Sequence, residues 1–442
     1  MEFPNNLDYI PVNKIKKSKT EKQQEEKKKQ DISEALDYNN IKQVKTQKVK
    51  LDVEKIIQKA RKVKEEGSMK KAIKFGIVGL GQAGGRMAET FETLNYPTIA
   101  INTSPQDLEK CNCSKKLEIG DIGAGKDLKI GRTAVNRHRS NIMKVYQNEF
   151  SDIDHALVVA GSSGGTGGGG LESVIETLLN FKKPVGVLTT LPLSSEDTRA
   201  KKNTLSVLNR LVDLNRTGKI KPLIIIDNNK IEKNHPGLST LKFWRVANEE
   251  VVKTFDLFNR LSATSSEYSS LDPADYRKII NSGGCMIFGN IAIEEINVED
   301  IGLISKAITN NIDSGLLVEG FDLTESTHVG CMIVGNPKQI QEIPRAMEED
   351  AFNTINQVIG SGSVYKGVYG LERLSYPEVF FMFSGLGLPE KRFRDLISDV
   401  KTETKHFEEK ATHRTVSDIL QDMGEEGLDI DLDASGEEAN EE

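Results

Sequence analysis

A run of small residues follows directly on an apolar stretch before the middle of the chain. Residues 161–170 read Gly-Ser-Ser-Gly-Gly-Thr-Gly-Gly-Gly-Gly and come after the apolar stretch 155–160. Glycines lack the β-carbon that blocks close approach, so successive backbone N–H groups can converge on phosphate oxygens, and a helix predicted over 171–180 would point its positive end there. A P-loop would place Lys and then Ser or Thr after the last glycine, but Leu171 and Glu172 stand there. The pattern predicts a phosphate site without a P-loop lysine.

Two more glycine loops precede this run. Residues 79–85 read Gly-Leu-Gly-Gln-Ala-Gly-Gly and fit the spacing G-x-G-x-x-G, and residues 120–125 read Gly-Asp-Ile-Gly-Ala-Gly. A dinucleotide site also needs a carboxylate roughly 20 residues after the first loop to hold the ribose hydroxyls. Asn102 occupies that region instead. Three glycine loops without this carboxylate favour a triphosphate, and a nicotinamide-dependent oxidoreductase with a Rossmann fold stays as an alternative from another class.

Short apolar segments separated by helical patterns must position these loops. Such segments indicate parallel strands that are covered on both faces, at 73–78, 98–101, 156–160, 185–189 and 223–226. We therefore expect an α/β fold whose first domain is a doubly wound parallel sheet that binds GTP. Apolar residues at helical spacing then predict a helix over residues 241–261, which is long enough to connect this domain to a second one.

The second domain is predicted to be α+β with a mixed sheet. Its expected strands lie at 284–293, 327–334, 363–374 and 378–383. Its expected helices lie at 298–312 and 339–359, and a further helical stretch covers 390–410.

These patterns divide the chain into five segments. They are a charged flexible N-terminal extension (1–70), a nucleotide-binding domain (71–240), a central helix (241–262), a C-terminal activation domain (263–390), and a C-terminal helix with an acidic tail (391–442). Both ends of the chain are rich in charge and poor in large apolar residues, so we expect them to be disordered.

The composition of the chain excludes several classes of protein. A net charge of −7 over 442 residues gives no overall attraction for nucleic acid. Four cysteines form neither a disulfide framework nor a zinc-ligand spacing, which indicates a reducing, cytoplasmic compartment. No stretch of about 18 apolar residues occurs, so no membrane span is expected.

The order of the motifs resembles the tubulin/FtsZ superfamily of filament-forming GTPases, from about residue 74 to residue 388. The family's glycine signature is similar to residues 163–169, with departures at Ser163 and Gly168, and its first three loops resemble residues 79–86, 102–106 and 123–127. The resemblance implies GTP or GDP as ligand, with Mg²⁺ held mainly by the phosphates rather than by a protein metal site. The loop residues that it implies at the nucleotide are Gly81, Gln82, Ala83, Gly84, Gly85, Arg86, Asn102, Gly123, Ala124, Gly125, Gly164, Gly165, Thr166, Gly167 and Gly168.

The same resemblance implies the groups that recognise the base and the ribose. Two asparagines bind guanine in that family, because an amide can pair with a donor and an acceptor edge at once. Asn228 and Asn248 stand in the matching segments. Glu196 matches the acidic position of the ribose loop, and Arg199 stands one residue short of the family's arginine.

The catalytic element that the resemblance implies is a loop with two carboxylates. Hydrolysis of a triphosphate needs a water that is held in line with the γ-phosphorus. In the family this loop reads Asn-x-Asp-x-x-Asp and acts on the nucleotide of a different subunit; here Asp272 and Asp275 match, and Ser270 departs. Asp-Pro-Ala-Asp is also a common helix start, with Asp272 as N-cap and Pro273 in the first turn, and both interpretations can hold together.

The resemblance therefore implies a cytoskeletal GTPase that polymerises with itself head to tail, each active site being completed by the adjacent subunit. The divergent glycine signature and the acidic end look more like the plasmid- and phage-encoded members than like FtsZ of bacterial division. We expect a role in segregating DNA or positioning phage, with an adaptor or cargo bound through the N-terminal arm or the acidic tail. An FtsZ-like ring protein of cell division, and a member that binds GTP without hydrolysing it, stay as alternatives.

Overall fold

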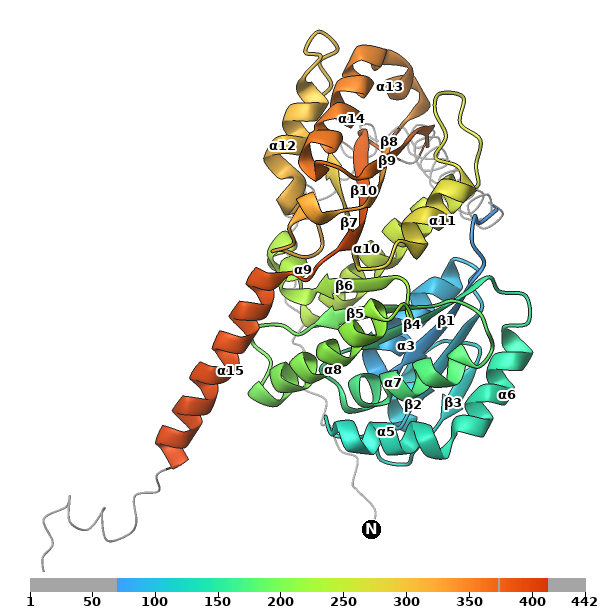
Figure 1. The fold of residues 1–442 in the computed structure, drawn as a ribbon, viewed down its shortest axis with the longest axis vertical. Coiled ribbons are helices and arrows are strands. Elements are labelled where there is room, and N and C mark those ends of the chain that lie inside the picture. Colours follow the sequence, from blue (N-terminus) through green and yellow to red (C-terminus); the bar gives the residue numbers. More distant parts are fainter. Residues whose placement is uncertain (1–69, 373, 412–442) are drawn as a thin grey trace, which may run out of the picture. The chain divides into compact units, whose positions relative to one another are not determined.

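A ten-stranded sheet organises the protein (Figure 1). The computed structural model describes residues 70–372 and 374–411. Within them the strand order is β3-β2-β1-β4-β5-β6-β7-β10-β8-β9. The sheet therefore runs from the first half of the chain into the second without interruption, since β6 pairs in parallel with β7.

The strands of the first half are parallel to one another. They are β1 (Phe75–Leu80), β2 (Thr98–Asn102), β3 (Lys116–Glu118), β4 (His155–Gly161), β5 (Val185–Leu191) and β6 (Leu223–Asp227). The helices between them are α3 (Gly81–Thr93), α4 (Pro105–Lys110), α5 (Leu128–Arg137), α6 (Arg139–Glu149), α7 (Gly165–Leu179), α8 (Thr198–Arg216) and α9 (Asn228–Asn234).

Helices cover both faces of this parallel sheet. One apolar cluster joins the strands to α5, α6, α7 and α8, and a second cluster joins them to α3, α4 and the long helix α10 (Thr240–Leu261). Every residue of β1, β4 and β5 is buried as a result. The doubly wound α/β fold and the long central helix are confirmed.

The second half of the chain is mixed, as predicted. Its elements are α11 (Pro273–Asn281), β7 (Cys285–Ala292), α12 (Leu303–Gly315), the 3-10 turn η1 (Leu323–Glu325), β8 (His328–Gly335), α13 (Pro337–Glu342), α14 (Arg345–Ile359), β9 (Ser363–Gly370), β10 (Glu378–Leu386) and α15 (Glu390–Ala411). Strand β10 is antiparallel to both β7 and β8, whereas β8 and β9 are parallel.

Three helix boundaries differ from the predicted ones. The helix expected over 339–359 is split into α13 and α14, because Pro344 lies between them and its ring cannot continue a helix. The helix expected over 298–312 begins only at Leu303, after a turn in which the N–H of Asp300 bonds to the carbonyl of Asn297. Helix α7 begins at Gly165 rather than Leu171, so most of the glycine run is helical.

Other expectations concern the ends of the chain and membranes. The predicted arm (1–70) and acidic tail fall almost wholly outside the described residues, and the five-segment division of the chain stays a prediction. Among the helices in the described ranges, none combines the length and the apolar character needed to cross a membrane.

One buried histidine makes the stability of this fold depend on pH. His155 begins β4, and its ring lies 5.1 Å from that of Phe75 on the neighbouring strand. Burial lowers the pKa of His155 to about 4, and its Nε2 has no hydrogen-bond partner within the described residues. The folded protein therefore keeps this ring neutral where an unfolded chain, with a histidine pKa of about 6.5, would bind a proton.

We expect the free energy of unfolding to fall as pH drops below about 6.5, because the unfolded state then binds a proton that the folded state excludes. The contribution is complete above pH 6.5, and about 2 kcal/mol of it is lost between pH 7 and pH 5. Urea denaturation at pH 7 and at pH 5 measures this loss of unfolding free energy for wild type and for His155→Leu. The variant should not show the loss. His138→Leu, which changes a half-buried histidine at the junction of α5 and α6, is the matched control. An equal loss of unfolding free energy between pH 7 and pH 5 in wild type and His155→Leu would contradict the role of His155.

Candidate functional site

A cavity of about 500 Å³ lies at the carboxyl ends of the parallel strands. Its lining includes the last residues of β1, β2 and β4, which are Leu80, Asn102 and Gly161. The strand order reverses between β1 and β4, because β2 and β3 extend the sheet to one side and β5 and β6 to the other. Ligands of open α/β sheets bind where the order reverses in this way.

One side of the cavity is built to hold an anion. Helices α3 and α7 both begin there, and their N-cap residues, Leu80 and Gly164, make no side-chain hydrogen bond to the helix. Neither helix has an acidic residue in its first turn. The first N–H groups of both helices are thus left for a ligand, and they carry the positive end of the helix dipole.

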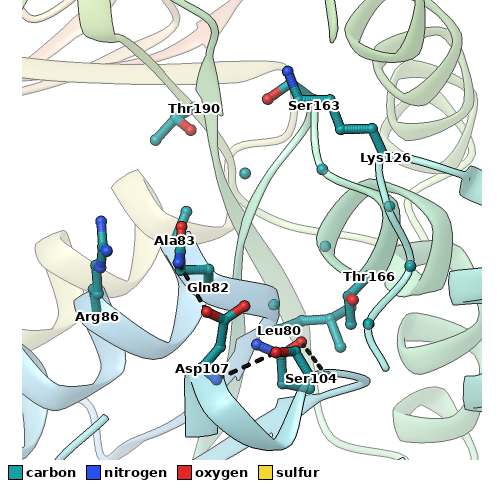
Figure 2. Close-up of a pocket in the computed structure, with 18 of the residues that line it drawn as sticks. Leu80, Gln82, Ala83, Arg86, Ser104, Asp107, Lys126, Ser163, Thr166 and Thr190 are labelled. Atoms are coloured by element: carbon teal, nitrogen blue, oxygen red, sulfur yellow. Dashed lines mark hydrogen bonds between the residues drawn. The ribbon is translucent and has the colours of Figure 1, made fainter. Parts of the chain in front are cut away.

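The two helix starts approach each other closely. Gly81 has a φ of +72°, and a β-carbon there would lie 2.9 Å from the backbone N of Gly167. A second contact fixes the same region, since the hydroxyls of Thr103 and Thr166 are 2.6 Å apart. Figure 2 shows Thr166 on one wall of the cavity, and Gln82 donating to Asp107 at 2.9 Å. The starts of α3 and α7 are therefore packed closely together on this side of the cavity.

The glycine run divides into two parts with different roles. Ser163 to Gly167 line the cavity. A β-carbon on Gly168 would lie 2.4 Å from the carbonyl oxygen of Ser162, so this glycine is required for packing of the helix rather than for the ligand. The structure thus places Ser163 to Gly167 at the cavity and Gly168 in the packing of α7.

The part of the lining where base recognition is predicted carries amide groups and an aromatic ring. Asn228, the first residue of α9, and Asn248, on α10, are 6% and 8% exposed, and both line the cavity. Neither side-chain amide has a hydrogen-bond partner in the part of the chain that the structure describes. Trp244 lies one helical turn before Asn248 and also lines the cavity, with its ring 5.0 Å from that of Phe243.

A third group of residues surrounds Glu196. Its carboxylate accepts hydrogen bonds from the backbone N–H of Leu193 at 3.2 Å and from the hydroxyl of Ser163 at 3.3 Å. Lys126 lines the cavity beside it, with its Nζ 2.7 Å from a carboxylate oxygen of Asp197 and 4.0 Å from one of Glu196. Lys126 holds the pKa of Asp197 below its ordinary value. Figure 2 shows Lys126 and Arg86 at opposite sides of the cavity.

The structure brings most of the predicted nucleotide residues to this one cavity. Those that line it are Gly81, Gln82, Ala83, Arg86, Asn102, Gly123, Ala124, Gly125, Gly164, Gly165, Thr166, Gly167, Glu196, Asn228 and Asn248.

Four predicted residues lie elsewhere. A β-carbon on Gly84 would lie 2.1 Å from the carbonyl oxygen of Val159, so this glycine lets α3 pack on β4, and Gly168 packs as described above. Gly85 lines a small neighbouring cavity. Arg199 lies on α8 and pairs with Asp127 at 3.4 Å, outside the lining.

Sequence reasoning missed several residues that line the cavity. Trp244 is the most informative, because it stands four residues before Asn248 and helical spacing places both on one face. Lys126 falls inside the predicted third loop, next to Gly125. Ser104 and Ser163 also fall inside the family loops that the sequence resembles. The others are Leu80, Met87, Asp107, Ile122, Gly161, Thr190 and Leu193.

The two predicted catalytic carboxylates do not line the cavity. Asp272 caps α11 through a hydrogen bond from the backbone N–H of Asp275 at 2.9 Å, and Pro273 occupies the first turn, as the N-cap interpretation requires. Asp275 pairs with Lys278 at 2.9 Å. The hydroxyl of Ser270 accepts from the N–H of Ser266 at 2.8 Å, so it is used within its own loop.

Side chains that could bind a metal ion do not cluster within the described residues. In the ranges 70–372 and 374–411, no group of three or more His, Cys, Asp and Glu side chains could hold a metal ion. The four cysteines, Cys111, Cys113, Cys285 and Cys331, are buried free thiols.

Comparison with known proteins identifies the family. Residues 74–235 match the family model 'Tubulin/FtsZ family, GTPase domain'. Residues 258–396 match the family model 'Tubulin/FtsZ-like protein TubZ-like, C-terminal domain'. The chain is 27% identical to the tubulin-like protein CetZ of Pyrococcus abyssi over 346 residues, which cover 75% of this chain and 90% of that protein. It is 30% identical to the cell division protein FtsZ 1 of Pyrococcus furiosus over 285 residues, which cover 62% of this chain and 71% of that protein.

A solved structure agrees at the level of the fold. The GTPyS-form protofilament of Bacillus thuringiensis serovar israelensis TubZ superposes with a TM-score of 0.68 at 20% identity, covering 78% of this chain and 95% of that one. The GTPase-domain match spans the glycine loops and α9, and the TubZ-like match spans α11 and the C-terminal strands. This chain belongs to the tubulin/FtsZ family, with the family's GTPase domain followed by a C-terminal domain of the TubZ-like type.

Proposed function

We propose that the protein binds and hydrolyses GTP and that it polymerises head to tail into filaments. The observation that carries the proposal is that the groups suited to bind a nucleotide and the predicted catalytic carboxylates lie in different places on the chain. The cavity supplies uncapped helix starts and amides for a nucleotide, while Asp272 and Asp275 lie on α11, outside its lining. A second copy that docks α11 over the cavity would supply the missing carboxylates. Such a contact joins two different faces of the protein. A pair of copies still exposes one face of each kind, so further copies can add and a filament forms.

The chemistry assigned to each group follows from its position. The first N–H groups of α3 and α7 would bind phosphate oxygens and neutralise the charge that develops on them during hydrolysis. Mg²⁺ in such sites is held largely by phosphates and water with one or two carboxylates, and Asp107 and Glu196 are the carboxylates in the lining. Asp272 and Asp275 of the neighbouring copy would orient and polarise the water that attacks the γ-phosphorus.

The biological role that we propose is segregation of DNA or positioning of phage in the cytoplasm. The match of the C-terminal half to the TubZ-like family supports the branch that the sequence resembles. An adaptor or cargo would bind the arm or the acidic tail, which are not among the described residues. The FtsZ-like ring protein is a weaker alternative for the same reason, and membership in a GTPase family leaves no support for an oxidoreductase.

The first test is phosphate release from GTP at increasing protein concentration. We expect the rate per molecule to rise steeply above a threshold concentration, because only assembled copies have complete active sites. Electron microscopy of the same samples should show filaments above that threshold. A rate per molecule that is constant with concentration would rule out an active site shared between copies.

The second test is the substitution Asp275→Ala. Its carboxylate lies outside the lining of its own cavity, so we expect unchanged binding of GTP, hydrolysis slowed about 100-fold or more, and filaments that last longer. Asp313→Ala, which removes an exposed carboxylate on α12, is the matched control and should behave as wild type. Normal turnover by Asp275→Ala would refute the catalytic role.

The third test uses the one tryptophan of the chain. Because Trp244 lines the base side of the cavity, we expect its fluorescence to change on addition of GTP or GDP. Loss of stacking in Trp244→Ala should raise the Kd for GTP by about tenfold or more, whereas Trp244→Phe keeps an aromatic ring and should retain most of the affinity. Calorimetry measures the variants that lack the fluorophore, and an unchanged Kd for Trp244→Ala would exclude a contact with the base.

A further inference from the structure

The first turn of α15 contacts the ends of two strands of the nucleotide-binding sheet. Arg392, which is 6% exposed, donates from Nε to Asp227 at 2.7 Å and from a terminal nitrogen to the same carboxylate at 3.3 Å. The terminal nitrogen also donates to the backbone carbonyl of Pro192 at 3.1 Å. One guanidinium therefore joins the end of β6 to the residue that follows β5.

Both of these contacts lie next to residues that line the cavity. Asp227 caps α9 through a hydrogen bond from the N–H of Asn229 at 3.1 Å, and Asn228 is the first residue of that helix. Pro192 begins the loop that carries Glu196. The loop and the helix are also joined directly, because the N–H of Ser194 donates to the side chain of Asn229 at 2.7 Å. Arg392 thus holds the segments that carry the base and ribose groups of the proposed site.

Helix α15 also holds the far end of the same loop. Thr198, the first residue of α8, donates its hydroxyl to Glu403 at 2.6 Å. Lys201, only 1% exposed, forms ion pairs with Glu403 and, at 3.4 Å, with Asp399. Arg392, Asp399 and Glu403 are spaced by seven and four residues, which places them on one face of α15. In Figure 1 α15 runs alongside α8 at this face.

The buried ion pair between Arg392 and Asp227 contributes more to the fixed position of the two side chains than to the stability of the fold. Burial raises the pKa of Asp227 above its ordinary value, although the guanidinium acts in the opposite direction. The cost of removing both charges from water offsets much of their attraction, so such pairs add little net stability. What the pair provides is a fixed geometry, since a guanidinium fork accepts only a narrow range of carboxylate positions.

We propose that Arg392 is a positioning residue for nucleotide recognition and that docking of α15 sets the affinity of the cavity. The proposal rests on the proposed function, because it concerns the same nucleotide site. Arg392 acts through Asp227 on Asn228, and through Pro192 on the loop with Glu196. By linkage, whatever detaches α15 weakens nucleotide binding, and bound nucleotide strengthens docking of α15 by the same factor.

Substitution of Arg392 tests the positioning role. Arg392→Met should raise the Kd for GTP and for GDP about tenfold, as judged from Trp244 fluorescence, and leave unchanged the hydrolysis rate of filaments saturated with GTP. Arg392→Lys keeps the charge but lacks the fork that bonds to both Asp227 and Pro192. Its Kd should therefore lie between those of wild type and Arg392→Met. Arg394→Met is the control, because Arg394 is exposed on the same helix and, among the described residues, pairs with Glu390. Wild-type affinity in folded Arg392→Met would overturn the proposal.

Hydrogen exchange on the unaltered protein provides a test that does not depend on a variant that folds. Residues 390–405 do not line the cavity, yet GTP should slow their amide exchange together with that of residues 192–197. Protection confined to the segments that line the cavity would overturn the proposal. If wild type shows no fluorescence change and no exchange protection with GTP, then the proposed function itself fails; a wild type that binds GTP while α15 is unaffected refutes only the role of α15.

Discussion

The site depends on unpaired backbone N–H groups at the starts of α3 and α7. Each group would be costly to leave without a partner at the edge of a buried sheet, and neither helix supplies a side-chain cap. An anion satisfies several of these groups at once. The reversal of strand order between β1 and β4 brings the two helix starts to the same place, and glycine at position 81 permits their close approach.

The parallel sheet could be predicted from the sequence because most of its strands are indicated by short, continuous patterns of residues. Strands such as β4 and β5 are buried on both faces and therefore read as continuous apolar runs between glycine loops. The start of α7 could not be predicted in the same way. Glycine disfavours helix, so Gly165 to Gly170 read as a loop, but close packing of α7 against α5 and β4 overrides that preference.

The candidate site was predictable only in part. Asn228 and Asn248 carry no signal on their own, and the resemblance to a family singled them out. Trp244 fits the apolar spacing of the long helix, and spacing alone cannot separate a ring that faces the core from one that faces a cavity. Arg392 and Asp227 are 165 residues apart in the chain, and nothing in the local pattern of either residue indicates the other.

The place of Asp272 and Asp275, away from the cavity of their own chain, has a consequence for any stack of identical copies. In the proposed filament each junction joins one cavity to one pair of carboxylates, so a stack contains one cavity more than it has junctions. The copy at one end keeps an uncovered nucleotide, whatever the length of the stack. The two ends of a polymer built from this fold are therefore chemically different without any additional protein to mark them.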